Sequence, residues 1–439
     1  MTQRVSTYTT ETSALNDEQR TIDILRKTLA YARTRDYKGW DYGDGMSSKL
    51  LQWFPIDNKW LNLVVQEVAK RPPINVRPLL LIEQRRNYKG TALFAMTNLN
   101  TAKLQSVCTP DETSASTPGS GAWSEMGIDT DVDYEDESYQ LNQWLISNRS
   151  VGYSGFCGGH KHQIQHFHSR GVPNDPDVVS TSYAVKSLLS AASLDPMYLS
   201  VAETAANFVV DDLNYRTVAD GACIDYHFNH PSDSYTINAG AIGARLLIDL
   251  YDQFGDESYR RRAKCLLDHI AGLQTDIGGW TYRDPPSASH LSMDNHHNGF
   301  VIEAFLRYQD VTGTDRYAKT LDRALTFYRE TLFDPSGAPN WDEKKSYPRD
   351  IHASAQGILV FTYAGDLDFA RRILAWALDN LYVGDGKFYY RKHRFYTTRV
   401  TLMRWCQAWM AYAMSEYLIA LQNQSKQTVD VRLSLAISC

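Results

Sequence analysis

The chain has 439 residues, of which 43% are apolar and 12% aromatic, and its formal net charge is −6. This length and composition allow a large buried core, and the slightly acidic balance argues against a nucleic-acid-binding protein. There is no charged-then-apolar leader and no apolar run of about 18 residues, which predicts a cytoplasmic protein without a membrane span. The six cysteines are scattered without a CxxC pair, as expected of reduced thiols.

The N-terminal part predicts two helices separated by an insertion. Residues 1–17 are rich in Thr and Ser and predict a flexible arm, after which apolar residues at helical spacing predict a helix over 17–35. Residues 36–89 are expected to form an inserted segment with its own helix at 47–70. That helix either packs on the body of the protein or makes peripheral contact with a membrane. A first inner helix is expected over 91–104.

The rest of the chain predicts five further helix pairs. Outer helices are expected near 134–147, 197–212, 257–273, 315–332 and 367–383. Inner helices, which are more apolar, are expected near 178–193, 236–254, 295–311, 351–364 and 398–421. The inner-helix starts recur at intervals of 47 to 59 residues, which is typical of stacked two-helix units. Six such hairpins predict an all-α fold, an (α/α)6 toroid over 18–425, with short β-hairpins in the loops and a tail at 426–439.

The strongest candidate for chemistry is the sequence SMDNHHNGF, at the start of one inner helix. It places Asp294, His296 and His297 together. Histidine exchanges protons near neutral pH, whereas an aspartate at this position acts either in catalysis or as a helix cap. In a closed ring, all the long loops meet at the N-termini of the inner helices, where the helix dipoles favour anions. We therefore expect these three residues to be catalytic.

The next inner helix begins with a similar cluster. Asp350 and His352 are further catalytic candidates, although a cap and a core histidine are the alternatives. Trp341 and Arg349 lie in the loop just before this helix. We expect them to contact the substrate.

A histidine-rich stretch precedes the inner helix at 178–193. It contains His160, His162, His166 and His168, but the spacing matches no standard zinc pattern, and we predict no metal. Asp177 directly precedes the helix. It is our first choice for a general acid, with a helix cap as the alternative.

Further candidate substrate contacts are aromatic, basic or polar side chains in the loops, since arginines bind carboxylates and aromatic faces stack on sugars. They are Trp40, Asp41, His168, Arg170, Asn174, Trp280, Tyr282, Arg283, Tyr390, Arg399 and Arg404. Several arginines at one site would predict an acidic substrate. Arg404 lies within an apolar helix, where a buried salt bridge is the alternative. No P-loop, GxGxxG or GxSxG motif occurs, so we expect no cofactor.

The hairpins, the GGW-x-Y turn and the polar inner-helix starts resemble the six-hairpin (α/α)6 glycosidase-like superfamily. This superfamily includes unsaturated glucuronyl hydrolases, N-acylglucosamine 2-epimerases and the toroid domains of polysaccharide lyases. A closer resemblance is to a poorly characterised family associated with polysaccharide and surface-glycan gene clusters. It rests on the segments GWDYGDGMSS, FHSRGVPNDPDVVSTSYAVKSLL and FYYRKHRFYTTRVTLMRWCQAWMAYA.

The resemblance implies a carbohydrate-active enzyme that cleaves an acidic, uronate-containing glycan. We expect hydrolysis by a carboxylate general acid. Ser180 stands where the glucuronyl hydrolases have an aspartate, with Asp177 one turn earlier, whereas His296 or His297 and His352 are similar in position to the epimerase histidines. The alternatives are therefore a lyase with His297 or Tyr390 as base, a histidine-dependent epimerase, and a non-catalytic glycan-binding protein of polysaccharide assembly.

Overall fold

The computed structural model describes residues 2–53, 57–108, 131–165, 170–228 and 234–437. Its outer helices are α1 (Thr2–Arg33), α6 (Tyr134–Ser147), α8 (Met197–Glu203), α9 (Ala205–Asn207) with the π-helical turn η2 (Phe208–Asp212), α11 (Glu257–Gly272), α13 (Ala318–Thr331) and α15 (Leu367–Asn380). Its inner helices are α4 (Tyr88–Cys108), α7 (Val178–Ser190), α10 (Ile237–Phe254), α12 (Asn295–Thr312), α14 (Ile351–Tyr363) and α16 (Trp409–Ile437).

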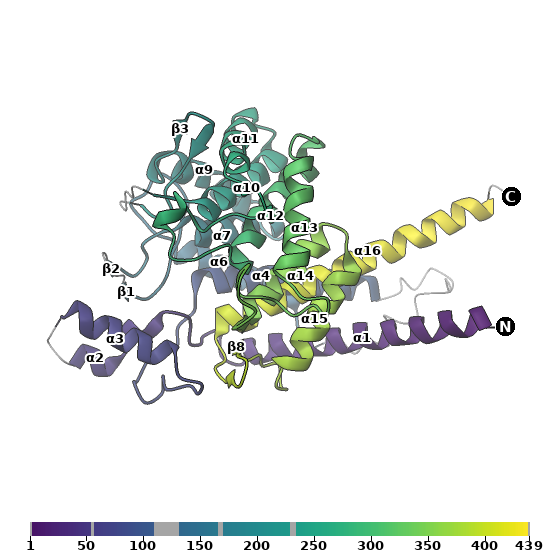
Figure 1. Ribbon diagram of the computed structural model, residues 1–439, viewed down its shortest axis with the longest axis horizontal. Coiled ribbons are helices and arrows are strands. Elements are labelled where there is room, and N and C mark those ends of the chain that lie inside the picture. Colours follow the sequence, from purple (N-terminus) through teal and green to yellow (C-terminus); the bar gives the residue numbers. More distant parts are fainter. Residues whose placement is uncertain (1, 54–56, 109–130, 166–169, 229–233, 438–439) are drawn as a thin grey trace.

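The six inner helices form a closed ring. Each contacts the next in the order α4, α7, α10, α12, α14 and α16, and α16 contacts α4 in turn. Each inner helix also packs against the outer helix that follows it in the chain, and the last inner helix, α16, packs against α1. The helices α1 and α16 lie side by side in Figure 1. The predicted all-α toroid is thereby confirmed. α14 buries every residue from Ile351 to Thr362, as expected of a helix enclosed on both sides.

Two helix boundaries differ from the sequence-based expectations. α1 is helical from Thr2, where a flexible arm was expected up to residue 17. α16 continues to Ile437, where a tail was expected from residue 426. These ends of α1 and α16 extend from the body on the same side (Figure 1). Among the described residues, we find no helix with the length and apolarity needed to cross a bilayer.

The insertion between α1 and α4 forms a separate protrusion, on the side of the body opposite to the chain termini (Figure 1). It contains the 3-10 helix η1 (Asp44–Ser47), α2 (Lys49–Trp53) and α3 (Lys59–Lys70). The insertion is tied to the ring by backbone bonds, in which the N–H of Met403 donates to the carbonyl of Trp40 and that of Arg399 to Pro73.

Short antiparallel strands join the long loops at one end of the ring. They are β1 (Ile164–Gln165) with β2 (Arg170–Gly171), β3 (Arg216–Val218) with β4 (Gly221–Cys223), β5 (Tyr235–Thr236) with β6 (Arg283–Asp284), and β7 (Arg349–Asp350) with β8 (Arg391–Lys392), which also pairs with β9 (Thr397–Thr398). Two short helices lie in the same loops, η3 (Pro286–Ala288) and the π-helical turn η4 (Met403–Ala408) that leads into α16.

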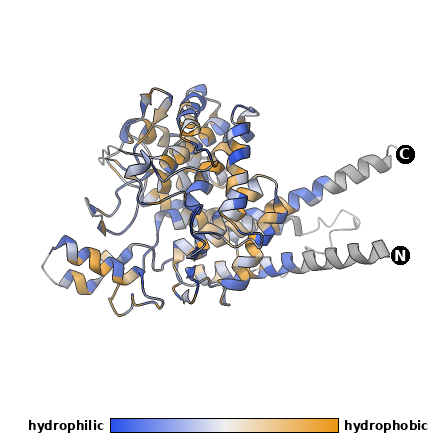
Figure 2. Cartoon of the chain, in the orientation of Figure 1, coloured by the Kyte–Doolittle hydropathy of each residue, from blue (hydrophilic) through white to orange (hydrophobic). Residues whose placement is uncertain are grey.

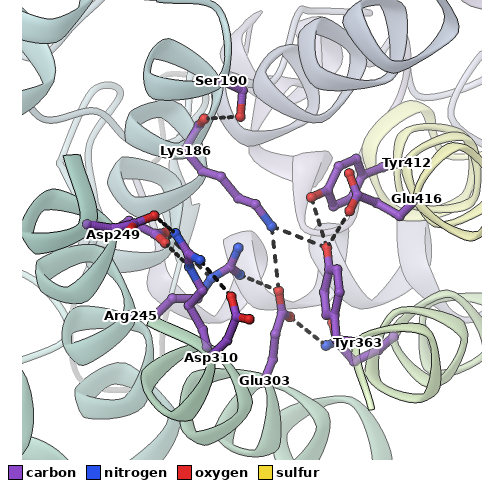
Figure 3. A network of polar contacts seen from close by, with 12 residues as sticks. Lys186, Ser190, Arg245, Asp249, Glu303, Asp310, Tyr363, Tyr412 and Glu416 are labelled. Atoms are coloured by element: carbon purple, nitrogen blue, oxygen red, sulfur yellow. Dashed lines mark hydrogen bonds and ion pairs between the residues drawn. The ribbon is translucent and has the colours of Figure 1, made fainter. Parts of the chain in front are cut away.

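A buried polar network links all six inner helices about two to three turns below their N-termini. Figure 3 shows its members on α7, α10, α12, α14 and α16. Its members are Asn100, Lys186, Arg245, Glu303, Tyr363 and Glu416. The guanidinium of Arg245 lies 2.5 Å from Glu303, and the amide of Asn100 donates to Glu416 at 2.7 Å. Because charges in an apolar core require partners, these contacts favour one arrangement of the six helices around the ring.

Candidate active site

The residue that directly precedes an inner helix pairs with the next loop around the ring. Asp177 forms a β-bridge with His227, and Asp294 forms one with Asp342. Thr236 pairs with Arg283 and Asp350 with Arg391 in the same way. The loops are therefore held to one another, and the N-termini of α7, α10, α12 and α14 face one shared region.

Three of the predicted aspartates cap inner helices in this region, and all three are buried. One carboxylate oxygen of Asp177 accepts a hydrogen bond from the backbone N–H of Ser180 at 2.7 Å. The other oxygen accepts one from the Ser180 hydroxyl, also at 2.7 Å. Asp294 and Asp350 cap α12 and α14 in the same manner. The three carboxylates therefore have a structural role at the starts of these helices.

Asp294 also contacts both neighbouring histidines. The ring Nδ1 of His297 lies 2.9 Å from its carboxylate, and that of His296 lies 3.3 Å away. Burial acts to raise the pKa of Asp294, but the two histidines outweigh it and the pKa is lowered. Tyr282 lies with its ring 4.6 Å from that of His297, and burial raises its pKa to about 12.

His352 is buried beside this cluster without a hydrogen-bond partner. Its ring stacks on His296 at 4.8 Å and packs against Trp405 at 4.6 Å, while neither of its nitrogens finds a partner among the described residues. Burial and the neighbouring His296 lower the pKa of His352 well below its usual value, and burial has the same effect on the pKa of His296. Both rings are therefore neutral near pH 7 and able to accept a proton.

Below the histidines, an aromatic layer separates this region from the polar network. The ring of Trp409 lies 4.4 Å from His352, 5.7 Å from Phe300 and 5.1 Å from Tyr183. The guanidinium of Arg245, a member of the polar network, lies 5.6 Å from the ring of Tyr183. This apolar layer forms the floor of the candidate site and keeps the histidines apart from the charges below.

Lys89 is a buried cation that the candidate residues above omit. Burial, followed by the nearby Arg404, lowers the pKa of Lys89 to about 7. Its ammonium lies 5.7 Å from the ring of Trp409, and it has no ion-pair partner among the described residues. Lys89 stands in the first turn of α4, where the helix dipole disfavours a cation. The helix predicted from the sequence began at residue 91, so it did not include Lys89.

The alternative for Arg404 is confirmed, because it forms a buried ion pair with Asp41. The Nε of Arg404 donates to Asp41 at 2.8 Å, and the Asn87 amide donates to the same oxygen at 2.7 Å. A second buried pair joins Arg77 to Asp44 at 2.9 Å, and Arg77 also donates to the Asp41 carbonyl. Asp41 and Arg404 thus join the insertion to the start of α16.

Arg391 and Trp405 fix Asp350 in place. The Nε of Arg391 donates at 2.6 Å and the indole of Trp405 at 2.8 Å. The guanidinium of Arg391 lies 4.7 Å from the ring of Trp341 and 4.3 Å from that of Tyr390. Sequence reasoning selected Trp341 and Tyr390 but not Arg391 or Trp405. The hydroxyl of Tyr390 is buried without a partner among the described residues.

Other predicted substrate contacts lie away from the histidines. Trp280 is 2% exposed, stacks on Phe305 and donates its indole N–H to the Ile270 carbonyl, so it belongs to the core. Arg349 pairs with Asp334 at 2.7 Å. Both side chains therefore have partners within the protein, although the Nε of Arg349 is buried without a hydrogen-bond partner among the described residues.

The remaining candidates lie in the loops and the insertion. Arg170 pairs with Asp57, Asn174 is exposed and accepts from Lys161, and Arg399 is exposed. Arg283 donates to Ser234, and the indole of Trp40 donates to the Ile82 carbonyl. His168 lies outside the described residues.

One His and carboxylate group among the described residues has the geometry of a metal site. Potential ligand atoms of Asp294, His296 and His297 all lie within 4.8 Å of one another. In the stretch that we considered from the sequence, the rings of His160 and His162 lie 5.4 Å apart, while His166 and His168 lie outside the described residues. Burial lowers the pKa of His162 to about 4.

No protein-family model and no curated protein sequence matches the chain, so its membership of the polysaccharide-associated family stays a prediction. Solved structures do match. An unsaturated glucuronyl hydrolase specific for heparin is 13% identical with a TM-score of 0.59, covering 94% of this chain and 98% of that one. The chain has the (α/α)6 toroid fold.

Two further similar structures have the same fold and different activities. A cellobiose 2-epimerase from Bacillus thermoamylovorans B4167 is 12% identical with a TM-score of 0.57, and covers 77% of this chain and 89% of its own. A glycoside hydrolase family 76 mannosidase from Bacteroides thetaiotaomicron VPI-5482 is 11% identical with a TM-score of 0.55. The match covers 93% of this chain and 100% of the mannosidase chain. At these identities the likeness establishes the fold, and the activity has to be argued from the site.

Proposed function

We propose that the protein is a carbohydrate-active enzyme whose histidines move a proton at a sugar carbon next to a carbonyl group, as a sugar epimerase or isomerase does. The observation that carries the proposal is His352, a buried and neutral imidazole with no hydrogen-bond partner among the described residues, stacked on His296. A general base has to be neutral and available in this way.

His297 is the second proton-transferring group. Its Nδ1 faces the Asp294 carboxylate at 2.9 Å, which favours the tautomer with a proton on Nδ1 and a lone pair on Nε2. In epimerisation, one histidine enters the cycle neutral and the other enters it protonated on both ring nitrogens. The neutral ring removes the proton from carbon, the electron pair moves onto the carbonyl oxygen, and the protonated ring returns its proton to the opposite face as the carbonyl re-forms. The sugar keeps its mass, and the two histidines have exchanged protonation states, ready for the reverse reaction.

Lys89 is placed to stabilise the intermediate. An enediolate carries negative charge on oxygen, and a buried cation is most effective where water is excluded. Lys89 has no ion-pair partner among the described residues, whereas Arg404 and Arg391 are neutralised by Asp41 and Asp350. The same ammonium would also attract a substrate carboxylate, which supports our expectation of an acidic, uronate-type sugar.

Hydrolysis, which the sequence alone ranked first, is the second candidate. It is favoured by the likeness to the glucuronyl hydrolase, which spans 94% of the chain. A general acid has to carry a proton and reach the substrate, however, whereas Asp177 uses both of its oxygens to hold Ser180 at the start of α7, and the pKa of Asp294 is lowered. These observations make both carboxylates less suitable as the proton donor.

The test is a product screen in heavy water. The full chain is incubated with neutral reducing sugars and with saturated and unsaturated uronate oligosaccharides, and products are followed by mass spectrometry and NMR. Epimerisation or isomerisation incorporates one carbon-bound deuterium without cleavage. Cleavage with a gain of water indicates the hydrolase, and cleavage without it indicates a lyase. Binding without exchange or cleavage would overturn the enzyme proposal in favour of a glycan-binding protein.

A further inference from the structure

The amphipathic helix α3 has its polar side turned toward the protein and its apolar side toward solvent. Asn62 and Gln66 are buried, whereas Trp60, Val64 and Val68 are exposed. This is the reverse of a helix that packs on a globular body. Figure 2 shows the hydrophobic residues of the protruding insertion in orange.

Specific contacts hold α3 in this orientation. The Gln66 amide donates to the Gln165 carbonyl at 2.8 Å and accepts the Gln165 N–H at 2.8 Å. Asn62 donates to the Gln165 side chain at 3.3 Å. Gly45 packs so closely that a β-carbon there would lie 2.7 Å from the α-carbon of Gln66. These hydrogen bonds and this close packing therefore keep the apolar side of α3 turned toward solvent.

The segments on either side of α3 also carry exposed apolar side chains. Large exposed apolar side chains gather here, at Trp53, Trp60, Val64, Val68, Ile74 and Leu79, and we call these six residues the α3 face. Trp53 is 69% exposed and Leu79 is 77% exposed. A shallow groove lined by Trp60, Val64, Val68 and Pro72 runs along it. An exposed apolar groove of this kind marks an interaction site.

The charge of the segment indicates which partner it meets. Among the described residues of the segment 49–81, three exposed side chains are basic (Lys49, Lys59 and Arg71) and one is acidic (Asp57). Lys59 lies with its ammonium 5.0 Å from the ring of Trp60, and Arg71 is exposed at the end of α3. Exposed tryptophans bordered by basic side chains are typical of helices that lie in the headgroup layer of a bilayer.

We propose that the α3 face docks the protein peripherally onto an anionic lipid surface. The tryptophans and aliphatic side chains would enter the headgroup region, while the basic side chains meet lipid phosphates. A second copy of the chain is a less suitable partner, because a two-fold interface would bring the same basic residues of both copies together. This inference does not depend on the proposed function.

The test is co-sedimentation of the full chain with vesicles of phosphatidylcholine alone or mixed with phosphatidylglycerol. We expect binding to the mixed vesicles, weakened by salt. The variant Trp53→Ser/Trp60→Ser should bind on the order of tenfold or more weakly, because two large side chains lose their burial in lipid. Phe395→Ser is the matched control, since Phe395 is an 88% exposed aromatic outside the insertion, and it should bind like the unmodified protein.

Three results would overturn the proposal. The first is no sedimentation with mixed vesicles, and the second is equal sedimentation of the double variant when circular dichroism shows it folded. The third is a dimer in light scattering that the double variant dissociates, which would assign the α3 face to a second copy of the chain. Unchanged sugar turnover in the double variant would separate this test from that of the proposed function.

Discussion

Asp294 binds His297 twice, through the backbone N–H at 3.3 Å and through the ring Nδ1 at 2.9 Å. The first bond starts helix α12 and the second orients a candidate catalytic ring. One carboxylate therefore has a structural and a chemical role, and a substitution can separate them.

Asp294→Asn should lower turnover by about 10²–10⁴-fold with little loss of stability. Asparagine is as good an N-cap as aspartate, but its neutral amide no longer enforces the Nδ1–H tautomer of His297. Deuterium incorporation into the sugar measures turnover, and urea denaturation measures stability. Asp256→Asn, at the cap of outer helix α11, is the matched control and should leave both unchanged. Equal turnover in the two variants would show that the ring bond has no catalytic role.

His352→Asn should abolish carbon-bound deuterium exchange while the protein stays folded. The amide keeps a polar group of similar size but cannot take up a proton near neutral pH. His269→Asn, in an outer helix beside Tyr235, is the control and should exchange at the normal rate. Exchange by the His352 variant within a few-fold of the unmodified rate would assign the base to another residue.

The rate should not decline in mildly acidic solution, where histidines usually become protonated. It should decline on the alkaline side instead. His296 and His352 have pKa values well below 6.5, so they remain neutral and basic in mildly acidic solution. Lys89 has a pKa of about 7 and loses its positive charge as the pH rises through that value. Activity should therefore decline above about pH 7.

Two substitutions of Lys89 test the origin of that decline. In Lys89→Arg the charge persists, and the decline should shift to higher pH. In Lys89→Met activity should be low at every pH, without a limb near 7. Initial rates over a range of pH measure both, and an unchanged profile in Lys89→Met would exclude Lys89 from the reaction.

Arg404→Met should destabilise the protein by about 3–5 kcal/mol, because it leaves the Asp41 carboxylate buried without its ion-pair partner. The double variant Asp41→Asn/Arg404→Met should lose less than the two single losses added together, since no charge is stranded. Urea unfolding gives the three free energies. Simple additivity would mean that the two side chains do not stabilise each other.

Trp280→Ala should act on stability and leave sugar binding unchanged. Trp280 is buried against Phe305, so its truncation should cost about 3–5 kcal/mol. Trp341→Ala should instead weaken sugar binding and leave stability unchanged, since Trp341 is half-buried beside Arg391 near the histidines. Thermal unfolding and KM for the identified sugar distinguish the two. A raised KM for Trp280→Ala alone would move Trp280 into the site.

The sequence predicted the ring because helical periodicity and loop punctuation are local properties. It also brought together Asp294, His296, His297, Asp350 and His352, because residues at the N-termini of neighbouring inner helices have to share one end of a ring. It could not separate Trp280 from Trp341, since both are tryptophans in loops before inner helices and only packing directs one into the core.

Contacts between residues distant in the sequence could not be predicted either. The pairing of Arg404 with Asp41 spans 363 positions and depends on how the insertion lies on α16. Lys89 was missed for a related reason, because its isolation from carboxylates is a property of the assembled ring. The outward orientation of α3 likewise follows from contacts with Gln165, a hundred residues away.

The contact between the first and last inner helices has a consequence for how the protein is made. α16 packs against α4, and Asn100 binds Glu416, which lies 316 positions later. A chain leaves the ribosome N-terminus first, so α4 emerges long before its final neighbour has been translated. Until then the apolar flank of α4 lacks its cover. A chain truncated before residue 409 would keep that flank exposed and be a substrate for chaperones and proteases, so quality control can recognise an unfinished copy by its open ring.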